Sequence, residues 1–285
     1  MVGPPVTVVN ACTRYGQGGS PTAVVIDDAT LTDDGRHAIA RRTDTSHTAF
    51  IDTSAADTPR MRFFTSAGEL TNCGHGIIAA QAVLLHRSGA TEHHGRQRSG
   101  GRTFATTAIR RHDGVEVWFD QGVIALPDDA DATGGGIIAA LGLGRADIAA
   151  DVRVASPGTP RLLVPVRDRR TLLSTRPDFV RLATECRRFG YLGCFIYALS
   201  PTAGTGTARM FAPAIGVDED IANANSVGCL AAHLLDTSGN GEIEIHQGDT
   251  LRRPSSVFAK ATHTRSGIVA RIGGVVDLGP PIDLG

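Results

Sequence analysis

Cys73 and His75 stand two residues apart, where a polar loop gives way to an apolar, helix-like run. A thiol and an imidazole can both exchange protons near neutral pH, and a helix N-terminus lowers the pKa of a thiol placed there. We favour His75 as a group that contacts substrate or relays a proton, although it could instead bond to the loop backbone. The role of Cys73 stays open, because a free cysteine is often an inert packing group. Gly74 and Gly76 share this helix start, and we expect them and Cys73 to lie against the substrate.

A degenerate copy of the same segment begins about half a chain later, with Asn223 in the place of Cys73. We expect Asn223, Asn225 and Ser226 to bind substrate, together with the free backbone N–H groups of the helix start. Each copy follows an arginine-led strand-like run and ends at Ser-Gly, so the chain reads as two duplicated halves. Two such helix starts would aim their positive dipole ends at one cleft that holds an anion.

The spacing of apolar residues predicts a chain rich in strands, with one long central helix in each half. The expected strands cover 5–9, 22–26, 48–51, 61–65, 102–109, 115–119, 161–166, 193–199, 207–212, 242–246, 256–260 and 268–272, and the expected helices cover 34–42, 74–88, 177–188 and 226–237. Residues 90–101 are expected to form a polar loop, and 128–136 are the candidate linker. We place an N-terminal domain at 1–125, to which a strand near 268–285 could return, and a C-terminal domain at 126–285. This pattern indicates an α+β pair of domains.

The composition excludes several classes of protein. With 285 residues, 41% hydrophobic residues and a net charge of −1, the chain has the balance of a globular protein and not of a nucleic-acid binder. No apolar run is long enough to span a bilayer and the N-terminus lacks a basic start, so we expect a cytoplasmic protein with no membrane partner. The five cysteines are odd in number and widely spaced, which argues for free thiols and against a disulfide framework or a structural zinc site.

Four segments in chain order resemble motifs of the PhzF family, the phenazine-biosynthesis-like isomerases. Residues 19–24, 64–75, 209–220 and 247–255 resemble the family's GNPxAV, FTPxxExxxCGH, RxFxPxxGxxED and QGxxxxRPS motifs. The resemblance implies the diaminopimelate epimerase-like fold, in which two pseudo-symmetric domains each curl a mostly antiparallel sheet around a central helix. It also implies an active site between the domains, no cofactor and a homodimer. We expect no metal.

In the phenazine enzymes of this family, a glutamate in a Ser-Glu-Ser-Thr-Phe segment moves the proton. The similar segment here, 45–50, has His47 at that position, and an unperturbed imidazole with a pKa of about 6.5 can accept and return a proton. Without the resemblance, His47 would read as an ordinary exposed or capping histidine. Asp220 matches the family's aspartate; it could cap the second helix or hold His47 or His75 in its working tautomer. Three further residues in matching motifs are expected to bind substrate: Ser20, Gln247 and Gly248.

The expected activity is that of a cofactor-independent isomerase that moves a proton, and with it a double bond, in a small carboxylated, unsaturated metabolite. His47 would be the shuttling base, supported by Asp220 and His75. Because PhzF-like proteins also occur in antibiotic pathways, an alkylproline-type precursor is a candidate substrate. One alternative is an amino-acid racemase or epimerase that uses Cys73 and another base. It is disfavoured because racemases of this fold use a cysteine at each helix start and Asn223 replaces the second; Cys229, further along that helix, is expected to be buried core. The other alternative is a non-catalytic small-molecule binder.

Overall fold

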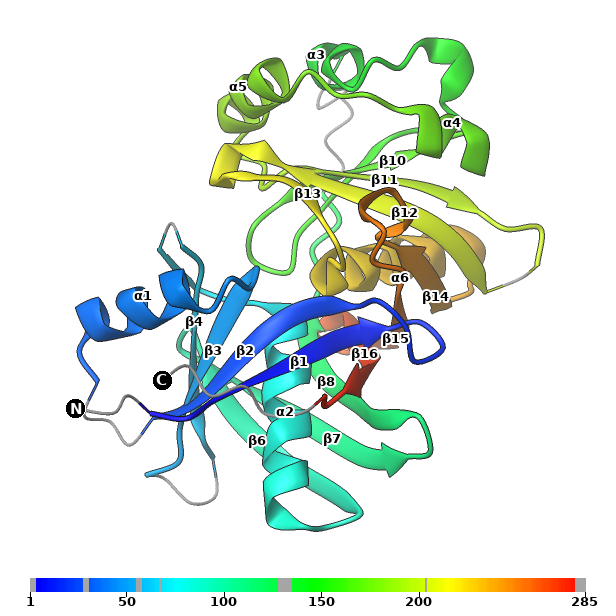
Figure 1. Cartoon of the computed structure of the whole chain (residues 1–285). Coiled ribbons are helices and arrows are strands. Elements are labelled where there is room, and N and C mark those ends of the chain that lie inside the picture. The colour runs from blue at the N-terminus through cyan, green and yellow to red at the C-terminus, as the bar shows by residue number, and fades with distance from the viewer. Residues whose placement is uncertain are drawn as a thin grey trace. The chain divides into compact units, whose positions relative to one another are not determined.

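The computed structural model describes residues 4–27, 31–54, 58–66, 68–127, 135–202 and 204–279. The chain forms two compact units, one of Met1–Asp120 with Ile272–Gly285 and one of Gln121–Arg271. In each unit the strands of a mixed sheet pack against one long helix, α2 or α6, which Figure 1 labels. The α+β class predicted from the sequence is confirmed.

The N-terminal unit contains a sheet with the strand order β1-β2-β3-β4-β6-β7-β8. Its elements are β1 (Val6–Thr13), β2 (Ser20–Asp27), α1 (Asp33–Arg42), β3 (His47–Asp52), β4 (Arg60–Phe64), β5 (Glu69–Leu70), α2 (Gly74–Ser88), β6 (Glu92–Ser99), β7 (Arg102–Arg111) and β8 (Gly114–Val123). The β2–β3 and β4–β6 pairs are parallel, and the short β5 pairs with β4. The end of β16 (Gly267–Asp277) pairs with β1 at Asn10 and Asp277, so the last strand contributes to this unit.

Helix α2 forms the centre of the N-terminal unit. Eleven of its 15 residues are buried, and it packs against β1, β2, β3 and β7. A helix that is apolar on all sides is stable inside a protein and not on its surface. It begins at the N-cap Cys73 and ends at Gly89, whose φ of 70° is left-handed and suits glycine at a helix C-terminus. The reactive side chains predicted from the sequence therefore stand on the first turn of a buried helix.

The C-terminal unit contains the strand order β15-β14-β12-β11-β10-β9. Its elements are α3 (Gly135–Ala140), β9 (Arg153–Ala155), β10 (Arg161–Pro165), α4 (Arg169–Ser174), α5 (Phe179–Phe189), β11 (Cys194–Leu199), β12 (Thr205–Ala212), β13 (Val217–Asp220), α6 (Ala224–Ser238), β14 (Glu242–Gln247), β15 (Ser255–Thr264) and residues 267–271 of β16, with 3-10 helices at Arg145–Asp147, Pro213–Ile215 and Asp249–Leu251. The β10–β11 and β12–β14 pairs are parallel. Helix α6 packs against β14, β15 and β9.

The two units repeat one local design. Helix α6 has the same length as α2, 15 residues, and it begins at the N-cap Asn223 and also ends at a left-handed glycine. Before each helix, an arginine of the preceding long strand makes two hydrogen bonds to one glutamate: Arg62 to Glu69, and Arg209 to Glu219. Each pair ties β4 to β5 or β12 to β13, and so orders the loop that leads into the helix.

Several elements differ from those that the apolar pattern predicts. Residues 90–101, expected as a loop, contain β6, which pairs with β7 from Glu92 opposite Ile109 to Ser99 opposite Arg102. Most of the β6 side chains are polar and exposed, so no apolar alternation marked this strand. The short helices α3 and α4 were not expected either. Most of the predicted linker lies outside the described residues, because 128–134 are not among them.

All five cysteines are free and buried. None of the helices in the described part of the chain has the length and apolar character needed to cross a bilayer.

Candidate functional site

Three side chains of the N-terminal unit meet in one place: His47, Cys73 and His75. His47 is the first residue of β3, Cys73 is the N-cap of α2, and His75 lies in the first turn of α2. Nδ1 of His47 lies 2.8 Å from Nε2 of His75, and the same Nε2 lies 3.4 Å from Sγ of Cys73. The three residues are 7%, 4% and 3% exposed in the order His47, Cys73, His75. We call them the His47–Cys73–His75 cluster; grouped buried acid–base side chains of this kind mark a candidate active site.

Glycine at position 76 allows the helix start to lie against the sheet. Its backbone N–H donates to Sγ of Cys73 at 3.4 Å, which satisfies one of the free donors of the first turn. A Cβ at Gly76 would lie 2.8 Å from the ring of Phe63 and 3.0 Å from the Cys73 sulfur, closer than real Cβ contacts. Gly74, the first residue of α2, is also buried. The close packing at Gly76 is a sufficient reason for glycine there, and the contact of Gly74 and Gly76 with substrate stays a prediction.

His47 is positioned by the parallel pairing of β2 with β3. It lies opposite Thr22 in that pair, and its backbone oxygen accepts a hydrogen bond from Oγ1 of Thr45 at 3.0 Å. The hydroxyl of Ser20, at the start of β2, lies 3.1 Å from that of Ser46. Ser20 therefore helps to order the turn that carries His47, and its predicted contact with substrate stays a prediction.

The short contact between His47 and His75 requires a proton between the two ring nitrogens, since two bare lone pairs at this distance repel each other. Either His47 donates from Nδ1 or His75 donates from Nε2. In the first arrangement neutral His47 carries its lone pair on Nε2, and in the second it carries a proton there. The rings lie edge to face, with centroids 4.2 Å apart and an interplanar angle of 78°. The pair can therefore present either a base or an acid.

The same cluster has the chemistry of a metal-ligand set. Its three nearest ligand atoms all lie within 4.8 Å of one another, and two imidazoles with one thiolate are donors that zinc accepts. A thiophilic divalent ion would be held by His47, Cys73 and His75. The expectation that the protein needs no metal for its activity stays a prediction.

A second group of predicted residues lies at the start of α6 in the C-terminal unit. Asn223 caps this helix: its Oδ1 accepts from the N–H of Ser226 at 3.0 Å, and its Nδ2 donates to Oδ2 of Asp220 at 2.9 Å. The backbone N–H of Asn223 donates to Oε1 of Gln247 at 3.1 Å. Asp220 therefore orders the loop before α6. Its suggested role in orienting a catalytic histidine stays a prediction.

Arg161, which the sequence analysis did not single out as a site residue, completes this second group. It is 2% exposed and donates to Oγ of Ser226 at 3.1 Å, to Oδ1 of Asn223 at 3.4 Å and to the carbonyl of Thr159 at 3.0 Å. These partners are neutral, and burial lowers the pKa of the guanidinium. A buried cation at a helix N-terminus attracts an anion. The signal available in the sequence was an arginine at the first position of an otherwise apolar strand.

The remaining predicted residues belong to the same region of the C-terminal unit. Asn225 accepts hydrogen bonds from Nε2 of Gln121 through its backbone oxygen at 3.1 Å and its Oδ1 at 3.2 Å. Gln247 is 1% exposed, and within the described ranges its Nε2 has no hydrogen-bond partner, which leaves a donor for a ligand. Gly248 has a φ of 76°, and a Cβ there would lie 2.0 Å from the carbonyl oxygen of Arg253, so the turn itself requires glycine. Substrate binding by these residues stays a prediction.

Comparison with known proteins decides the family. The family model PhzC-PhzF, described as phenazine biosynthesis-like protein, matches residues 9–274. The chain belongs to this family. It is 30% identical to the uncharacterized isomerase YddE of Escherichia coli O157:H7 over 268 residues, which cover 91% of this chain and 90% of that protein. It is 27% identical to phenazine biosynthesis-like domain-containing protein 2 of Mus musculus, with 85% and 87% covered. The resemblance found in the sequence is confirmed, and the names of the bacterial relatives support an isomerase.

Solved structures confirm the predicted epimerase-like fold. A PhzF-family protein of Bacillus anthracis superposes with a TM-score of 0.84 at 19% identity, covering 96% of each chain. A predicted epimerase of Pseudomonas aeruginosa gives a TM-score of 0.82 at 26% identity, covering 99% of each chain. A probable proline racemase of Agrobacterium radiobacter gives 0.62 at 10% identity, covering 97% of this chain and 91% of that one, which is a likeness of fold alone.

Proposed function

We propose that this PhzF-like protein is a cofactor-independent isomerase acting on a small carboxylated, unsaturated metabolite. It would take a proton from one carbon and return it to another, so that a double bond shifts. The observation that carries the proposal is the 2.8 Å contact between Nδ1 of His47 and Nε2 of His75 in a nearly fully buried cluster. Membership in a family with relatives named isomerases supports the reaction class.

His47 is proposed as the shuttling base. With Nδ1–H donated to His75, the lone pair on Nε2 of His47 accepts the substrate proton, and the resulting positive charge strengthens the hydrogen bond to His75. The proton on Nδ1 can then pass to Nε2 of His75, so both rings share the charge while the substrate carries a delocalised negative charge. Return of the proton to another carbon restores the neutral pair. No external acid is consumed, which suits an isomerisation.

Cys73 is proposed to hold the helix start in place and to line the substrate site. Its sulfur accepts from the N–H of Gly76 and lies 3.4 Å from Nε2 of His75, so it contacts the relay. The racemase alternative gives this thiol a direct role as base. It would need a second base in place of Asn223, which caps α6 through its own hydrogen bonds.

The start of α6 is proposed to bind substrate through polar donors. The proposal is supported by Nε2 of Gln247, which has no partner in the part of the chain that the structure describes, and by the buried positive charge of Arg161 beside Ser226. Backbone N–H groups and the positive end of the helix dipole add to the attraction for a carboxylate. We further propose that the enzyme acts without a cofactor, as a homodimer in the cytoplasm, on a precursor of bacterial secondary metabolism such as an alkylproline-type unit. These finer points rest on the family resemblance.

Incubation in D2O tests the reaction class. The probes are a panel of small β,γ-unsaturated carboxylic acids and unsaturated proline analogues, together with L-amino acids. An isomerase places deuterium at a new carbon, a racemase places it at the original Cα, and a binder that only retains the fold places none. Mass spectrometry and NMR locate the label.

Substitution of the proposed base tests the assignment of roles. His47→Ala should slow exchange on the active probe about 10²- to 10⁴-fold, the usual contribution of a general base. His94→Ala is the matched control, because that histidine is exposed on β6 and hydrogen-bonds to Glu92. Full exchange by the His47→Ala protein would remove His47 from the mechanism.

A further inference from the structure

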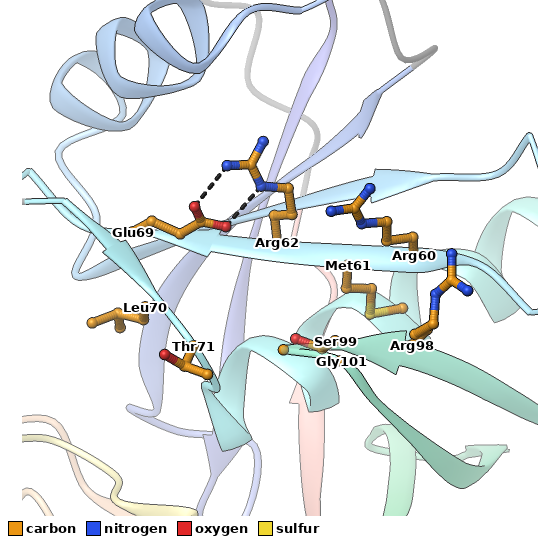
Figure 2. A pocket seen from close by; sticks show the side chains of 10 residues that line it. Arg60, Met61, Arg62, Glu69, Leu70, Thr71, Arg98, Ser99 and Gly101 are labelled. Atoms are coloured by element: carbon orange, nitrogen blue, oxygen red, sulfur yellow. Dashed lines mark hydrogen bonds and ion pairs between the residues drawn. The ribbon is translucent and has the colours of Figure 1, made fainter.

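One cavity of the N-terminal unit is lined by none of the residues of the His47–Cys73–His75 cluster. It has a volume of about 450 Å³ and is lined by β4, β5 and the segment that joins β6 to β7 (Figure 2). Strands β4 and β6 pair in parallel at Arg60 and Arg98, and the cavity lies next to this pair. Its volume is within the range of pockets that bind small metabolites.

Two arginines face the cavity from neighbouring strands. Arg60 and Arg98 are register partners in the β4–β6 pair, and both side chains are exposed. Two like charges at paired positions of neighbouring strands repel each other. In the described part of the chain, neither guanidinium makes a hydrogen bond or salt bridge to a carboxylate. Arg60 contributes to the lowered pKa of Asp52, but the main cause there is the hydrogen bonds from Ser54.

The third arginine of the cavity differs from these two. Arg62 donates two hydrogen bonds to Glu69, at 2.7 and 2.6 Å, and a third to Asp33 at 2.5 Å. Figure 2 shows the Arg62–Glu69 bonds as dashed lines, with Arg60 and Arg98 beyond them. The carboxylate that lines this cavity is therefore already neutralised, and the cations that remain are Arg60 and Arg98.

A buried hydroxyl is also among the residues that line the cavity. Ser99 lines the cavity and is 3% exposed, and its Oγ has no hydrogen-bond partner among the described residues. A buried hydroxyl without a partner destabilises the folded protein, so the Ser99 hydroxyl is available as a donor to a ligand. Two guanidinium groups and one hydroxyl together form a set of donors, which is what an oxyanion requires.

We propose that this cavity is an oxyanion-binding site, which takes the carboxylate or phosphate group of a small metabolite between Arg60 and Arg98 with Ser99 as a third donor. The planar guanidinium groups present paired N–H donors that match both kinds of oxyanion. A bound anion separates the two like charges and satisfies the hydroxyl. The site uses none of the proposed catalytic residues, so the proposal of an anion site can be tested independently of the isomerase proposal.

Calorimetric titration of the full-length protein with inorganic phosphate and with succinate tests the site, at low ionic strength so that screening does not hide the binding. Saturable binding of either probe is expected; phosphate alone would identify a phosphate site, and succinate alone a carboxylate site. Arg98→Gln and Arg60→Gln should each weaken binding about 10- to 100-fold, the contribution of a charged hydrogen bond. Arg96→Gln is the matched control, since Arg96 is an exposed arginine of β6 that does not line the cavity. If neither probe saturates, or if Arg98→Gln binds as well as the unaltered protein, the proposal is wrong.

Thermal unfolding gives a second readout that does not depend on calorimetry. Removal of one of the two facing cations should raise the melting temperature of Arg98→Gln in anion-free buffer. Added phosphate or succinate should raise the melting temperature of the unaltered protein and of Arg96→Gln, but not that of Arg98→Gln. Ser99→Ala, which removes the hydroxyl without a partner, should be at least as stable as the unaltered protein in anion-free buffer and should bind the probe more weakly. Equal stabilisation by the anion in all variants would overturn the proposal.

Discussion

The two arginine–glutamate pairs before α2 and α6 allow a matched test of how burial sets the contribution of an ion pair. Both pairs have the same geometry, with the guanidinium donating to both carboxylate oxygens of the glutamate. In the C-terminal unit the side chains of Arg209 and Glu219 are 7% and 9% exposed. In the N-terminal unit those of Arg62 and Glu69 are 21% and 42% exposed. The substitutions Glu219→Gln and Glu69→Gln remove the same charge and nearly the same atoms.

The expected losses of unfolding free energy differ because water can solvate the charge of Arg62 when its glutamate is removed, but not that of the buried Arg209. Breaking a buried pair from one side costs about 3–5 kcal/mol of unfolding free energy. We expect the lower end, about 3 kcal/mol, for Glu219→Gln. Arg209 keeps its bonds to the carbonyls of Leu172 and Thr175, at 3.0 and 2.8 Å, and its place over the Phe211 ring. For Glu69→Gln the cost is about 1 kcal/mol or less, as for exposed pairs in general. At about 2–4 °C per kcal/mol for a unit of this size, Glu219→Gln should melt about 6–12 °C lower.

Amide hydrogen exchange read by mass spectrometry is the appropriate assay, because a protein with two units need not unfold in one step. Peptides from β12, β13 and the start of α6 should exchange faster in Glu219→Gln, while those of the N-terminal unit keep their rates. In Glu69→Gln the change should be small and confined to β4, β5 and the start of α2. If Glu69→Gln destabilised its unit as much as Glu219→Gln does, burial would not be the deciding factor and the reasoning would fail.

Three further outcomes are expected at the N-terminal unit. Gly76→Ala should lower the free energy of unfolding by about 1–3 kcal/mol, because the added Cβ would lie 3.0 Å from the Cys73 sulfur. The control Gly135→Ala places its Cβ in open space within α3 and should not lower it. Equal melting temperatures of the two variants would contradict this prediction. Added Zn²⁺ should bind the His47–Cys73–His75 cluster and stop proton exchange. In competition with a chromogenic chelator, Zn²⁺ should bind the Cys73→Ser protein at least about tenfold more weakly than the unaltered protein. The hydrogen bonds from Arg62 are the main cause that lowers the pKa of Glu69 from its ordinary value of 4.5. The stabilisation by ionised Glu69 is therefore complete above pH 4.5, and it is lost as the pH falls through the lower pKa that Glu69 has in the folded protein. Below pH 4.5, the urea midpoint of Glu69→Gln should therefore decrease less steeply with falling pH than that of the unaltered protein.

The helix starts could be predicted from the sequence because their signals are local. The small-residue run after Cys73 and the closing Ser-Gly fix both ends of α2, and the same pattern fixes α6 after Asn223. Strand β6 gave no such signal, because a polar strand that buries few side chains does not alternate in hydrophobicity. Its existence depends on pairing with β7, which is a tertiary interaction.

The residues of the site likewise divide into those that a local sequence pattern predicts and those that it does not. His75 and Cys73 could be named as reactive groups from their place at a helix start, whereas His47 was found through a family motif. That His47 contacts His75 follows from the packing of β3 beside α2, which no local pattern contains. Arg161 was not predicted as a site residue, because a charged residue at a strand end is usually exposed. In the structure it is 2% exposed, with its charge facing neutral partners.

In the proposed mechanism, a histidine in the place of the family's glutamate changes the charge of the resting site. A carboxylate beside His75 would favour a charged imidazolium, whereas two imidazoles that share one proton form a neutral pair. In the proposed reaction, the neutral pair would gain its single positive charge when the substrate loses a proton, at the moment when a negative charge develops on the substrate. Because the cluster is nearly fully buried, that attraction would be stronger than in water, and it would act in the proposed intermediate and not in the resting protein. The substitution is therefore consistent with retained proton transfer on a different substrate, and it does not by itself indicate a protein that has lost its chemistry.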